Sequence, residues 1–387
     1  MVDIAAYLKR QQKDGRLRQL PELEHPDGGR VRLSAAGPDL LDFSSNDYLG
    51  LSRHPLPLVA AADALSRYGT GAGAARLMSG DFALHRELEA ALARLKEQEA
   101  ALLFGSGYLA NVGLIPALVG RHDVIFGDRL NHASIHDGCQ LSGARLHRFA
   151  HNDCNHLEDL IKRHRGGKEA LIVVESLYSM DGDICPLAEV VALKERYGCR
   201  LLVDEAHATG LFGDNGAGLL AAEGLAHRVD LVMGTLGKAL GSYGAYVAGE
   251  QRLVSFLLNR ARSFIFSTAL PPASTAAALA AVQLLADEPE LRRELWRRVE
   301  IFKSGLTRGG IKAGLGPSQI VPLTVGDNQA ALDLAQRLRQ RGVYAAAVRP
   351  PTVPAGQARL RFSVTNHLDH DDLSAASAII ATELQKC

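Results

Sequence analysis

The sequence lacks a net charge, and this absence excludes a large class of proteins. Its 387 residues carry 43 lysines and arginines against 43 aspartates and glutamates. A protein that binds nucleic acid through a strongly basic surface needs an excess of positive charge, so nucleic acid is not expected as a partner. The shares of hydrophobic residues (47%) and charged residues (22%) are ordinary for a globular protein, which argues against a disordered chain.

Cysteines are few, and their spacing suggests no pairs. Their number is odd and no two form a C-x-x-C motif, which argues against a disulfide framework and against a structural zinc site. Reduced thiols in a cytoplasmic protein fit this pattern better. The five residues are Cys139, Cys154, Cys185, Cys199 and Cys387.

Long apolar runs are absent as well. The most apolar stretch, residues 276–286, is interrupted by Gln283 and is shorter than the roughly 20 residues that cross a bilayer. The first ten residues include Asp3 and no apolar core, so they predict the first turns of an amphipathic helix rather than a signal peptide. A membrane is therefore not expected as a partner.

What the sequence does contain is an alternation of short apolar runs with helical patterns. Each run is followed at once by small or polar residues, which is typical of buried parallel strands with functional loops at their carboxyl ends. Segments between them are long enough for crossover helices, as at 157–165 and 187–197. The expected strands are 100–104, 123–126, 171–174, 201–203 and 231–233.

This alternation predicts an α/β fold in three parts. They are an N-terminal helix and arm (1–45), a large α/β domain with a mainly parallel sheet (46–285) and a smaller α+β C-terminal domain (286–387). The C-terminal domain is expected to contain a helix over 291–306, a strand over 320–323, a helix over 329–341, a strand over 358–362 and a closing helix over 369–385.

Three residues after two of the expected strands form the strongest chemical pattern. Asp204 lies where a buried strand ends, and a carboxylate there can pair with a protonated ring nitrogen. His207 can reach the same place, and Lys238 follows the next strand, where desolvation can prepare an amine for Schiff-base formation. Singly, these residues are explained as a helix cap, a satisfied polar residue and a solvated amine. As an ordered set they predict a pyridoxal-phosphate site.

A glycine loop after the first expected strand predicts an anion site. Free backbone N–H groups and the helix dipole at this strand-to-helix turn favour a phosphate. Gly105, Gly107 and Ala110 also match G-x-G-x-x-A, a dinucleotide-binding pattern. That pattern requires an acid at the tip of the following strand, whereas Asp123 opens it. A nicotinamide-dependent dehydrogenase is therefore the alternative hypothesis.

Several other polar residues each have two readings. His132 can lie flat against an aromatic cofactor or can cap a loop. Thr235, Ser267 and Thr268 can donate to a phosphate, although hydroxyls before a helix are more often only N-caps. Arg349 precedes two prolines that would hold its guanidinium for bidentate carboxylate binding, or it is a surface arginine.

Three histidines close in sequence raise the question of a metal site. They are His147, His151 and His156. The surrounding arginine and asparagine residues are more typical of a solvated loop, so no metal is expected.

Five segments together resemble the α-oxoamine synthases, which are fold-type-I pyridoxal-phosphate enzymes. The likeness runs from about residue 16 to residue 370 and rests on Ser44–Leu51, Gly69–Arg76, Glu175–Asp183, Asp204–His207 and Gly234–Lys238. Within the family, residues 348–356 and 358–361 are most similar to the members that join L-alanine to a pimeloyl thioester in biotin biosynthesis. Leu236 departs from the family pattern, because many members carry an aromatic residue there.

The resemblance implies a role for each matching residue. Lys238 would bind the cofactor aldehyde and later remove the Cα proton, Asp204 would pair with the ring nitrogen, His207 would hydrogen-bond the ring oxygen and His132 would stack on the ring. Further cofactor contacts would come from Gly107, Tyr108, Ser179 and Thr235, with Ser267 and Thr268 reaching the phosphate from a neighbouring subunit. The substrate side would be lined by Arg18, Asn46, His132, Arg349 and Thr352, with Arg16 as an alternative to Arg18.

The resemblance also implies a homodimer with shared active sites. The acyl donor, a coenzyme A or an acyl-carrier-protein thioester, stays open at this point. Another α-oxoamine synthase activity, such as glycine C-acetyltransferase, is the nearer alternative, and the dehydrogenase is the more distant one.

Overall fold

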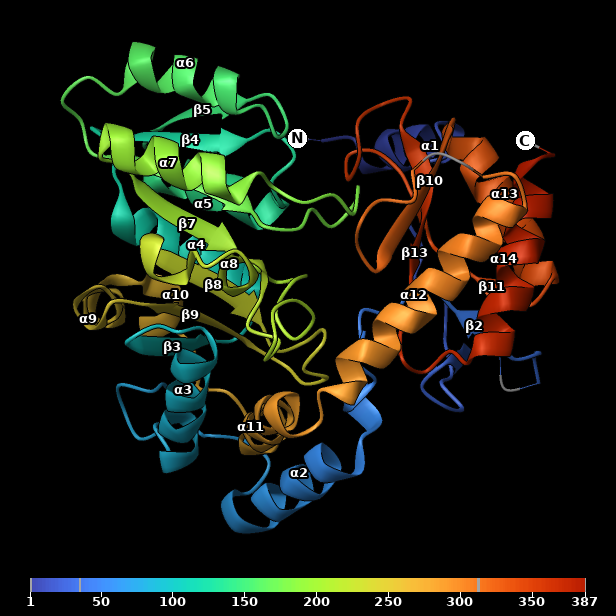
Figure 1. Ribbon diagram of the computed structural model, residues 1–387, viewed down its shortest axis with the longest axis horizontal. Coiled ribbons are helices and arrows are strands. Elements are labelled where there is room, and N and C mark those ends of the chain that lie inside the picture. The colour runs from blue at the N-terminus through green and yellow to red at the C-terminus, as the bar shows by residue number, and fades with distance from the viewer. Residues whose placement is uncertain (1, 35, 312–313, 387) are drawn as a thin grey trace. The chain divides into compact units, whose positions relative to one another are not determined.

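The chain divides into two compact units (Figure 1). The computed structural model describes residues 2–34, 36–311 and 314–386. The large unit comprises Leu51–Tyr178 and Ile184–Arg292, and the small unit combines the residues up to Gly50, the segment Ser179–Asp183 and the residues from Arg293 on. The two ends of the chain thus belong to one unit. The three-part division predicted from the sequence, with boundaries after residues 45 and 285, remains a prediction.

A seven-stranded sheet forms the centre of the large unit. Its order is β3-β9-β8-β7-β6-β4-β5, and β9 is antiparallel to both of its neighbours while the other pairs are parallel. All five predicted strands are confirmed, whereas β5 and β9 were not predicted. The strands are β3 (Ala100–Phe104), β4 (Val124–Asp128), β5 (Arg145–Phe149), β6 (Ala170–Glu175), β7 (Arg200–Asp204), β8 (Leu231–Thr235) and β9 (Ala245–Gly249).

Helices link these strands, and the central strands are buried along almost their whole length. Such burial is expected of a parallel sheet, because its crossover helices cover the faces. The helices are α2 (Pro55–Tyr68), α3 (Ala83–Leu95), α4 (Gly107–Leu118), α5 (Ala133–Ser142), α6 (Cys154–His164), α7 (Leu187–Tyr197), α8 (Leu219–Ala222), α9 (Gln251–Arg260), α10 (Arg262–Ile265) and α11 (Pro272–Asp287), with short 3-10 turns η1 (Leu51–Arg53) and η2 (Ala226–Arg228).

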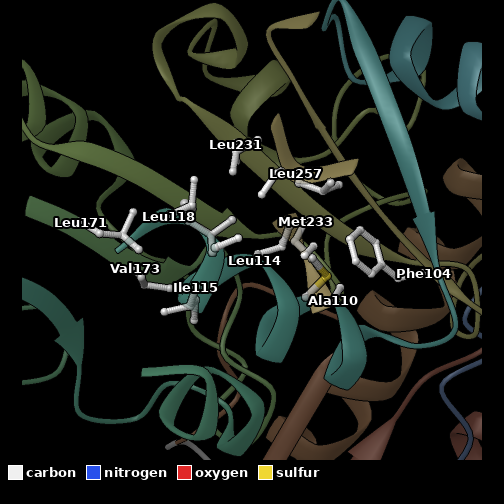
Figure 2. Packing of buried hydrophobic residues seen from close by; sticks show 14 of the residues in the cluster. Phe104, Ala110, Leu114, Ile115, Leu118, Leu171, Val173, Leu231, Met233 and Leu257 are labelled. Atoms are coloured by element: carbon white, nitrogen blue, oxygen red, sulfur yellow. The ribbon is translucent and has the colours of Figure 1, made fainter. Parts of the chain in front are cut away.

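The core of the large unit lies between the sheet and α4 (Figure 2). Alternate strand residues such as Val173 and Met233 point toward this helix, because successive side chains of a strand face opposite sides. They pack against Leu114 and Ile115, which are completely buried. Each large apolar side chain buried in this way stabilises the fold by about 1.5–3 kcal/mol. The packing therefore fixes the strand ends on which the polar residues lie.

The small unit contains two three-stranded sheets. In one, β13 pairs antiparallel with β10 and β12; in the other, β2 pairs antiparallel with β1 and parallel with β11. Phe43, Phe302 and Phe362 form its aromatic core, with ring centroids 5.0–6.0 Å apart. The elements are α1 (Ile4–Lys13), α12 (Glu290–Arg308), α13 (Asn328–Gln340), α14 (His370–Leu384), β1 (Arg30–Val31), β2 (Leu40–Asp42), β10 (Ile320–Gly326), β11 (Val343–Tyr344), β12 (Ala347–Val348) and β13 (Ala358–Ser363).

Two expectations from composition can be compared with the described residues. None of the helices in the described part of the chain has both the length and the apolar character to span a membrane. Cys139, Cys154, Cys185 and Cys199 are free thiols. Cys387, the fifth cysteine, lies outside the described residues.

Candidate active site

Three candidate site residues of the large unit lie at the carboxyl ends of three neighbouring parallel strands. Glu175 ends β6, Asp204 ends β7 and Thr235 ends β8. Since β6, β7 and β8 are adjacent, these ends meet at one edge of the sheet, which is where ligands bind in α/β proteins. His207 and Lys238 lie in the loops that follow β7 and β8.

Asp204 is held in one orientation by two donors. Asn111 Nδ2, from α4, donates to Oδ2 at 3.0 Å, and the backbone N–H of Ala206 donates to Oδ1 at 2.9 Å. The residue is only 5% exposed. A fixed carboxylate in such a water-poor place attracts a cation more strongly than it would in bulk water. Asp204 is therefore suited to keeping a ring nitrogen protonated, as predicted.

Lys238 lies beside His207, with 2.8 Å between Lys238 Nζ and His207 Nε2. Lys238 is half-buried and His207 is buried. The contact holds the amine at one point near the strand ends, where it is available for attack on an aldehyde. The structure thus brings together the two loop residues that the sequence pattern associated with Asp204.

His132 caps helix α5. Its Nδ1 accepts the backbone N–H of Ser134 at 3.2 Å, and its own backbone N–H donates to Glu175 Oε1 at 2.5 Å. Although the residue is exposed at the surface of the large unit, desolvation of its ring lowers the pKa of His132; the charge of Asp204 opposes this shift and that of Lys238 adds to it. The capping role is observed, and the stacking role stays a prediction.

Glu175 is a functional candidate that reasoning from the residues alone missed. It is the register partner of Asp204 on the adjacent strand, so the two side chains face the same side of the sheet. Only 3% of Glu175 is exposed. Burial, and then the charge of Asp204, raise the pKa of Glu175 well above its usual range. Burial beside Asp204 therefore favours the neutral form of Glu175.

We expect Glu175→Gln to stabilise the protein relative to wild type, and increasingly so from about pH 5 to pH 9. A carboxyl with a raised folded-state pKa contributes stability that is complete below its unfolded-state pKa of about 4.3 and is lost as the pH rises through the folded-state pKa. The amide removes this loss and still accepts the His132 N–H. Urea unfolding of the protein without cofactor at pH 5, 7 and 9 measures the difference. If the gain in unfolding free energy of Glu175→Gln over wild type stays constant or falls as the pH rises, the prediction is contradicted.

Glu158 offers a control of opposite sign. Hydrogen bonds from Tyr197 and Lys162, and one from Arg196, outweigh desolvation and lower the pKa of Glu158 to about 2. Stability from such a group is present above its unfolded-state pKa and is lost as the pH falls through the folded-state value. Glu158→Gln should therefore lose stability at neutral pH, and the loss should shrink in acid.

The glycine loop forms the start of α4. Ser106 caps the helix by accepting the N–H of Leu109 at 3.2 Å, which leaves the first turn at Gly107 and Tyr108 facing solvent as an anion site. The Tyr108 hydroxyl donates to Asp137. The acid at the tip of the next strand, Asp128, is completely buried and accepts the N–H groups of Leu130 and Asn152, so it is not available to a ribose. This geometry disfavours the nicotinamide alternative.

Ser267 and Thr268 follow α10 in an extended segment. The backbone of Thr268 forms an antiparallel bridge with Ala75, and the N–H of Ala269 donates to Ala74 O at 3.0 Å. These bonds join the Ser-Thr pair to the glycine-rich segment that precedes Arg76. Both side chains keep contact with solvent, as a role toward a second subunit requires.

In the small unit, Arg18, Thr352 and Arg349 lie together. Arg18 Nη2 donates to Thr352 Oγ1 at 3.2 Å, and Arg349 Nη1 donates to Gly15 O at 2.6 Å. Desolvation, and then the neighbouring charge of Arg18, lower the pKa of Arg349. Arg349 Nε is buried without a hydrogen-bond partner among the described residues. Two guanidiniums with an unused donor are suited to a carboxylate, and Arg18 rather than Arg16 contacts Thr352.

Asn46 and Ser179 meet in the same unit through Arg361. Arg361 Nη2 donates to Asn46 Oδ1 at 3.1 Å, and Nε donates to Ser179 O at 2.6 Å. Arg361 is only 8% exposed, and its recorded partners in the described part of the chain are all uncharged. This corner of the small unit is therefore electropositive. Reasoning from the residues alone gave Arg361 no part in the site.

A buried ion pair flanks His207 in the sequence and was also missed. Lys96 Nζ lies 2.5 Å from Glu205 Oε2 and also donates to Thr209 Oγ1 at 3.3 Å and to Ala217 O. Burial lowers the pKa of Lys96, but the charge of Glu205, together with Tyr246 and the hydrogen bonds to both, outweighs burial and the net shift of the pKa is upward. Both partners of Lys96 on this loop, Glu205 and Thr209, lie two residues from His207. The pair therefore anchors the loop that carries it.

The three clustered histidines have three separate surroundings. His147 stacks on His164, His151 contacts Asp128, and His156 Nδ1 accepts the N–H of Ala150. Within the described ranges, no group of three or more histidine, cysteine or acidic side chains is arranged to hold a metal ion. The three histidines thus have separate local roles.

Comparison with known proteins identifies the family of the chain. A family model for aminotransferase class I and II matches residues 38–379, and the chain belongs to this family. Its curated relatives include 8-amino-7-oxononanoate synthases. The protein from Geobacter sulfurreducens is 50% identical over 98% of this chain and 97% of its own length, and that from Anaeromyxobacter dehalogenans is 48% identical over 98% and 95%.

Solved structures confirm the predicted fold type I. Serine palmitoyltransferase from S. paucimobilis, solved with a bound PLP–myriocin aldimine, is 30% identical, covers 99% of this chain and 97% of its own, and has a TM-score of 0.92. The 8-amino-7-oxononanoate synthase from Francisella tularensis is 29% identical, with 90% and 98% coverage and a TM-score of 0.76. The predictions of family and fold are thus confirmed.

Proposed function

We propose that the chain condenses L-alanine with a pimeloyl thioester to give 8-amino-7-oxononanoate, carbon dioxide and a free thiol, as a step of biotin biosynthesis. The observation that carries this proposal is the contact between Lys238 and His207 at the strand edge that Asp204 occupies. Curated relatives that are 45–50% identical over nearly the whole chain bear the name of this product. We place the reaction in the cytoplasm.

The donor set of the large unit fits pyridoxal 5'-phosphate as the cofactor. Lys238 offers an amine for an aldehyde, Asp204 a fixed carboxylate for a pyridine nitrogen, and the start of α4 free N–H groups for a phosphate. When bound, this cofactor supplies an electron sink for the pair of electrons released at the amino-acid Cα. The further proposed cofactor contacts are Gly107, Tyr108, Ser179 and Thr235.

Each of the candidate site residues would have its own part in the proton transfers of this reaction. Lys238 Nζ would hold the cofactor through its aldehyde, and the free amine would be the base that accepts the Cα proton of the substrate. His207 Nε2 lies 2.8 Å from this amine, and His207 would also hydrogen-bond the ring oxygen of the bound cofactor, while Asp204 would keep its ring nitrogen protonated. His132 would lie against the ring and would donate a hydrogen bond in the acylation or decarboxylation step.

A homodimer is part of this proposal. Apolar side chains stay exposed around Ser267 and Thr268, which monomeric proteins avoid over large areas. Phe266, directly before Ser267, is 69% exposed, and Met78, three residues after Ala75, is 80% exposed. Helix α2 adds the exposed side chains of Leu56, Leu58 and Val59. A second copy covering this surface would bring Ser267 and Thr268 to the phosphate of its partner.

The substrate carboxylate is assigned to Arg349, with Arg18, Asn46 and Thr352 beside it. We expect Arg349→Lys to raise the KM for L-alanine by about 10- to 100-fold, because an ammonium keeps the charge but loses the two-pronged geometry of the guanidinium. The KM for the thioester should change little. Steady-state kinetics with each substrate varied in turn measures both values.

Arg341→Lys is the matched control. Arg341 lies in the same unit, is exposed and pairs with Glu383 at 3.3 Å, so its replacement should leave both KM values unchanged. An unchanged KM for L-alanine in Arg349→Lys removes that residue from the substrate site.

The function is tested with the purified, cofactor-loaded chain and L-alanine. Pimeloyl-coenzyme A and a pimeloyl acyl-carrier protein are supplied in separate reactions, and the aminoketone and free thiol are measured by mass spectrometry and thiol titration. Product from either donor supports the proposal and ranks the two thioesters. Product only from glycine and acetyl-coenzyme A instead identifies a glycine C-acetyltransferase.

A further inference from the structure

A chain of hydrogen bonds connects Asp204 with the ring of His132 through two buried side chains. Asn111 Nδ2 lies 3.0 Å from Asp204 Oδ2 and 3.0 Å from Ser134 Oγ. Ser134 Oγ in turn lies 2.8 Å from His132 Nδ1. Asn111 and Ser134 are each 1% exposed, so bulk water does not compete for these bonds. The chain joins α4, α5 and the end of β7.

The chemistry of the groups sets the direction of every bond in this chain. A carboxylate oxygen only accepts, so the amide nitrogen of Asn111, not its oxygen, must face Asp204. Both amide hydrogens are then used, one toward Asp204 and one toward Ser134 Oγ. Because Ser134 Oγ accepts from Asn111, its own hydrogen is available to His132 Nδ1. Asn111 Oδ1 has no partner in the described part of the chain, as expected if Asp204 dictates the orientation of the amide.

A second donor confirms that His132 Nδ1 is an acceptor. The backbone N–H of Ser134 lies 3.2 Å from the same nitrogen, and a backbone N–H can only donate. A proton on Nδ1 would point at two other hydrogen-bond donors, the hydroxyl and the backbone N–H of Ser134, and is therefore unfavourable. A neutral imidazole carries one proton, so it must be on Nε2. His132 Nε2 makes no hydrogen bond within the described residues and is free to donate to a ligand.

We propose that Asn111 and Ser134 are positioning residues that hold His132 as the neutral imidazole protonated on Nε2, so that the Nε2–H is available for the hydrogen bond to the acyl substrate that the proposed function assigns to His132. The inference rests on the proposed function for the identity of that substrate. The tautomer itself is a property of the chain alone.

Desolvation of the His132 ring favours the same neutral state. Desolvation lowers the pKa of His132; the Lys238 charge adds to this shift, and the charges of Asp204 and Asp137 oppose it. Burial, and then the charge of Asp204, raise the pKa of Glu175, which accepts the backbone N–H of His132, and so favour its neutral form. The donor is therefore available across the neutral pH range instead of depending on protonation of the ring.

The test is the tautomer of His132, read by proton–nitrogen NMR of the chain labelled with 15N-histidine and free of cofactor. Comparison with His132→Gln assigns the signals. Wild type should show His132 neutral and protonated on Nε2 at pH 7. His85 is an internal reference for this state, because its Nδ1 accepts the N–H of Phe82 and its Nε2 faces Leu270 O. A proton on Nδ1, or a charged ring at pH 7, overturns the proposal without any variant.

Ser134→Ala removes the hydroxyl and leaves only the backbone donor. The pKa of His132 should then rise by about 0.5–1 unit, the equivalent of one hydrogen bond, and the signals of His85 should not move. Ser377→Ala is the matched control, since Ser377 is equally buried and donates to Ser374 O in helix α14 of the small unit. An unchanged His132 pKa and tautomer in Ser134→Ala overturns the role of Ser134.

Kinetics separates this inference from the proposed function. In the cofactor-loaded enzyme, Ser134→Ala should lower kcat/KM for the thioester by about 3- to 10-fold while the affinity for the cofactor stays the same. If wild type turns over no thioester, the proposed function fails and the NMR result on the tautomer still stands. If turnover is normal but the NMR signals show the Nδ1 tautomer, only this inference fails.

Discussion

Lys238→Ala is expected to abolish the visible absorbance of the lysine–cofactor adduct and to lower turnover by more than the 10²- to 10⁴-fold that one general acid–base group contributes. The variant loses both the covalent attachment and the base that accepts the Cα proton. The readouts are the absorbance spectrum of the loaded protein and product formation under single-turnover conditions.

Lys303 provides a demanding control for this prediction. Desolvation lowers the pKa of Lys303 to about 8, so by acidity alone it is a plausible nucleophile in the small unit. Its Nζ donates to Gly316 O at 2.8 Å within the small unit, and neither residue belongs to the proposed cofactor contacts. Lys303→Ala should therefore keep the adduct and the turnover. Borohydride reduction followed by peptide mapping should find the cofactor attached to Lys238. Attachment to Lys303 instead would contradict the assignment of Lys238 as the cofactor-binding lysine.

Local sequence patterns were sufficient to predict part of this site. Asp204 and Lys238 follow buried parallel strands, and the carboxyl ends of such strands meet at one edge whatever the intervening helices do. An apolar run and the polar residue that follows it were therefore enough to predict that Asp204 and Lys238 lie at the same edge of the sheet. Glu175 ends β6 in the same manner, so the same argument could have included it.

The residues that were missed depend on contacts between distant segments. Lys96 and Glu205 are 109 residues apart, and Asn111 reaches Asp204 across 93 residues. Neither Lys96 nor Asn111 belongs to a pattern that distinguishes it from an ordinary helix residue. Strand β9 was missed for a similar reason, because its antiparallel place between β3 and β8 breaks the alternation of parallel strands and helices.

Lys96→Met is expected to destabilise the protein by about 3–5 kcal/mol, because it leaves the carboxylate of Glu205 buried without its counter-ion. Lys96 is 3% exposed and Glu205 is fully buried, so water cannot replace the lost ammonium. The loss should appear as a lower free energy of unfolding in urea, measured on the protein without cofactor. Arg228→Met, which breaks the exposed pair with Glu195, should leave that free energy nearly unchanged.

The double variant Lys96→Met/Glu205→Gln distinguishes charge from packing. Glutamine keeps an acceptor for the N–H of Leu220, which donates to Glu205 Oε1 at 2.9 Å, but carries no charge. If the unpaired charge causes the loss, the double variant should be more stable than Lys96→Met alone, whereas losses that simply add would show that packing dominates. Glu205 also ties its loop to β8 through its N–H to Met233 O at 2.8 Å. The unpaired charge of Glu205 in Lys96→Met should therefore also disturb this loop and the contact between His207 and Lys238. The double variant should recover that contact and the spectrum of the cofactor adduct.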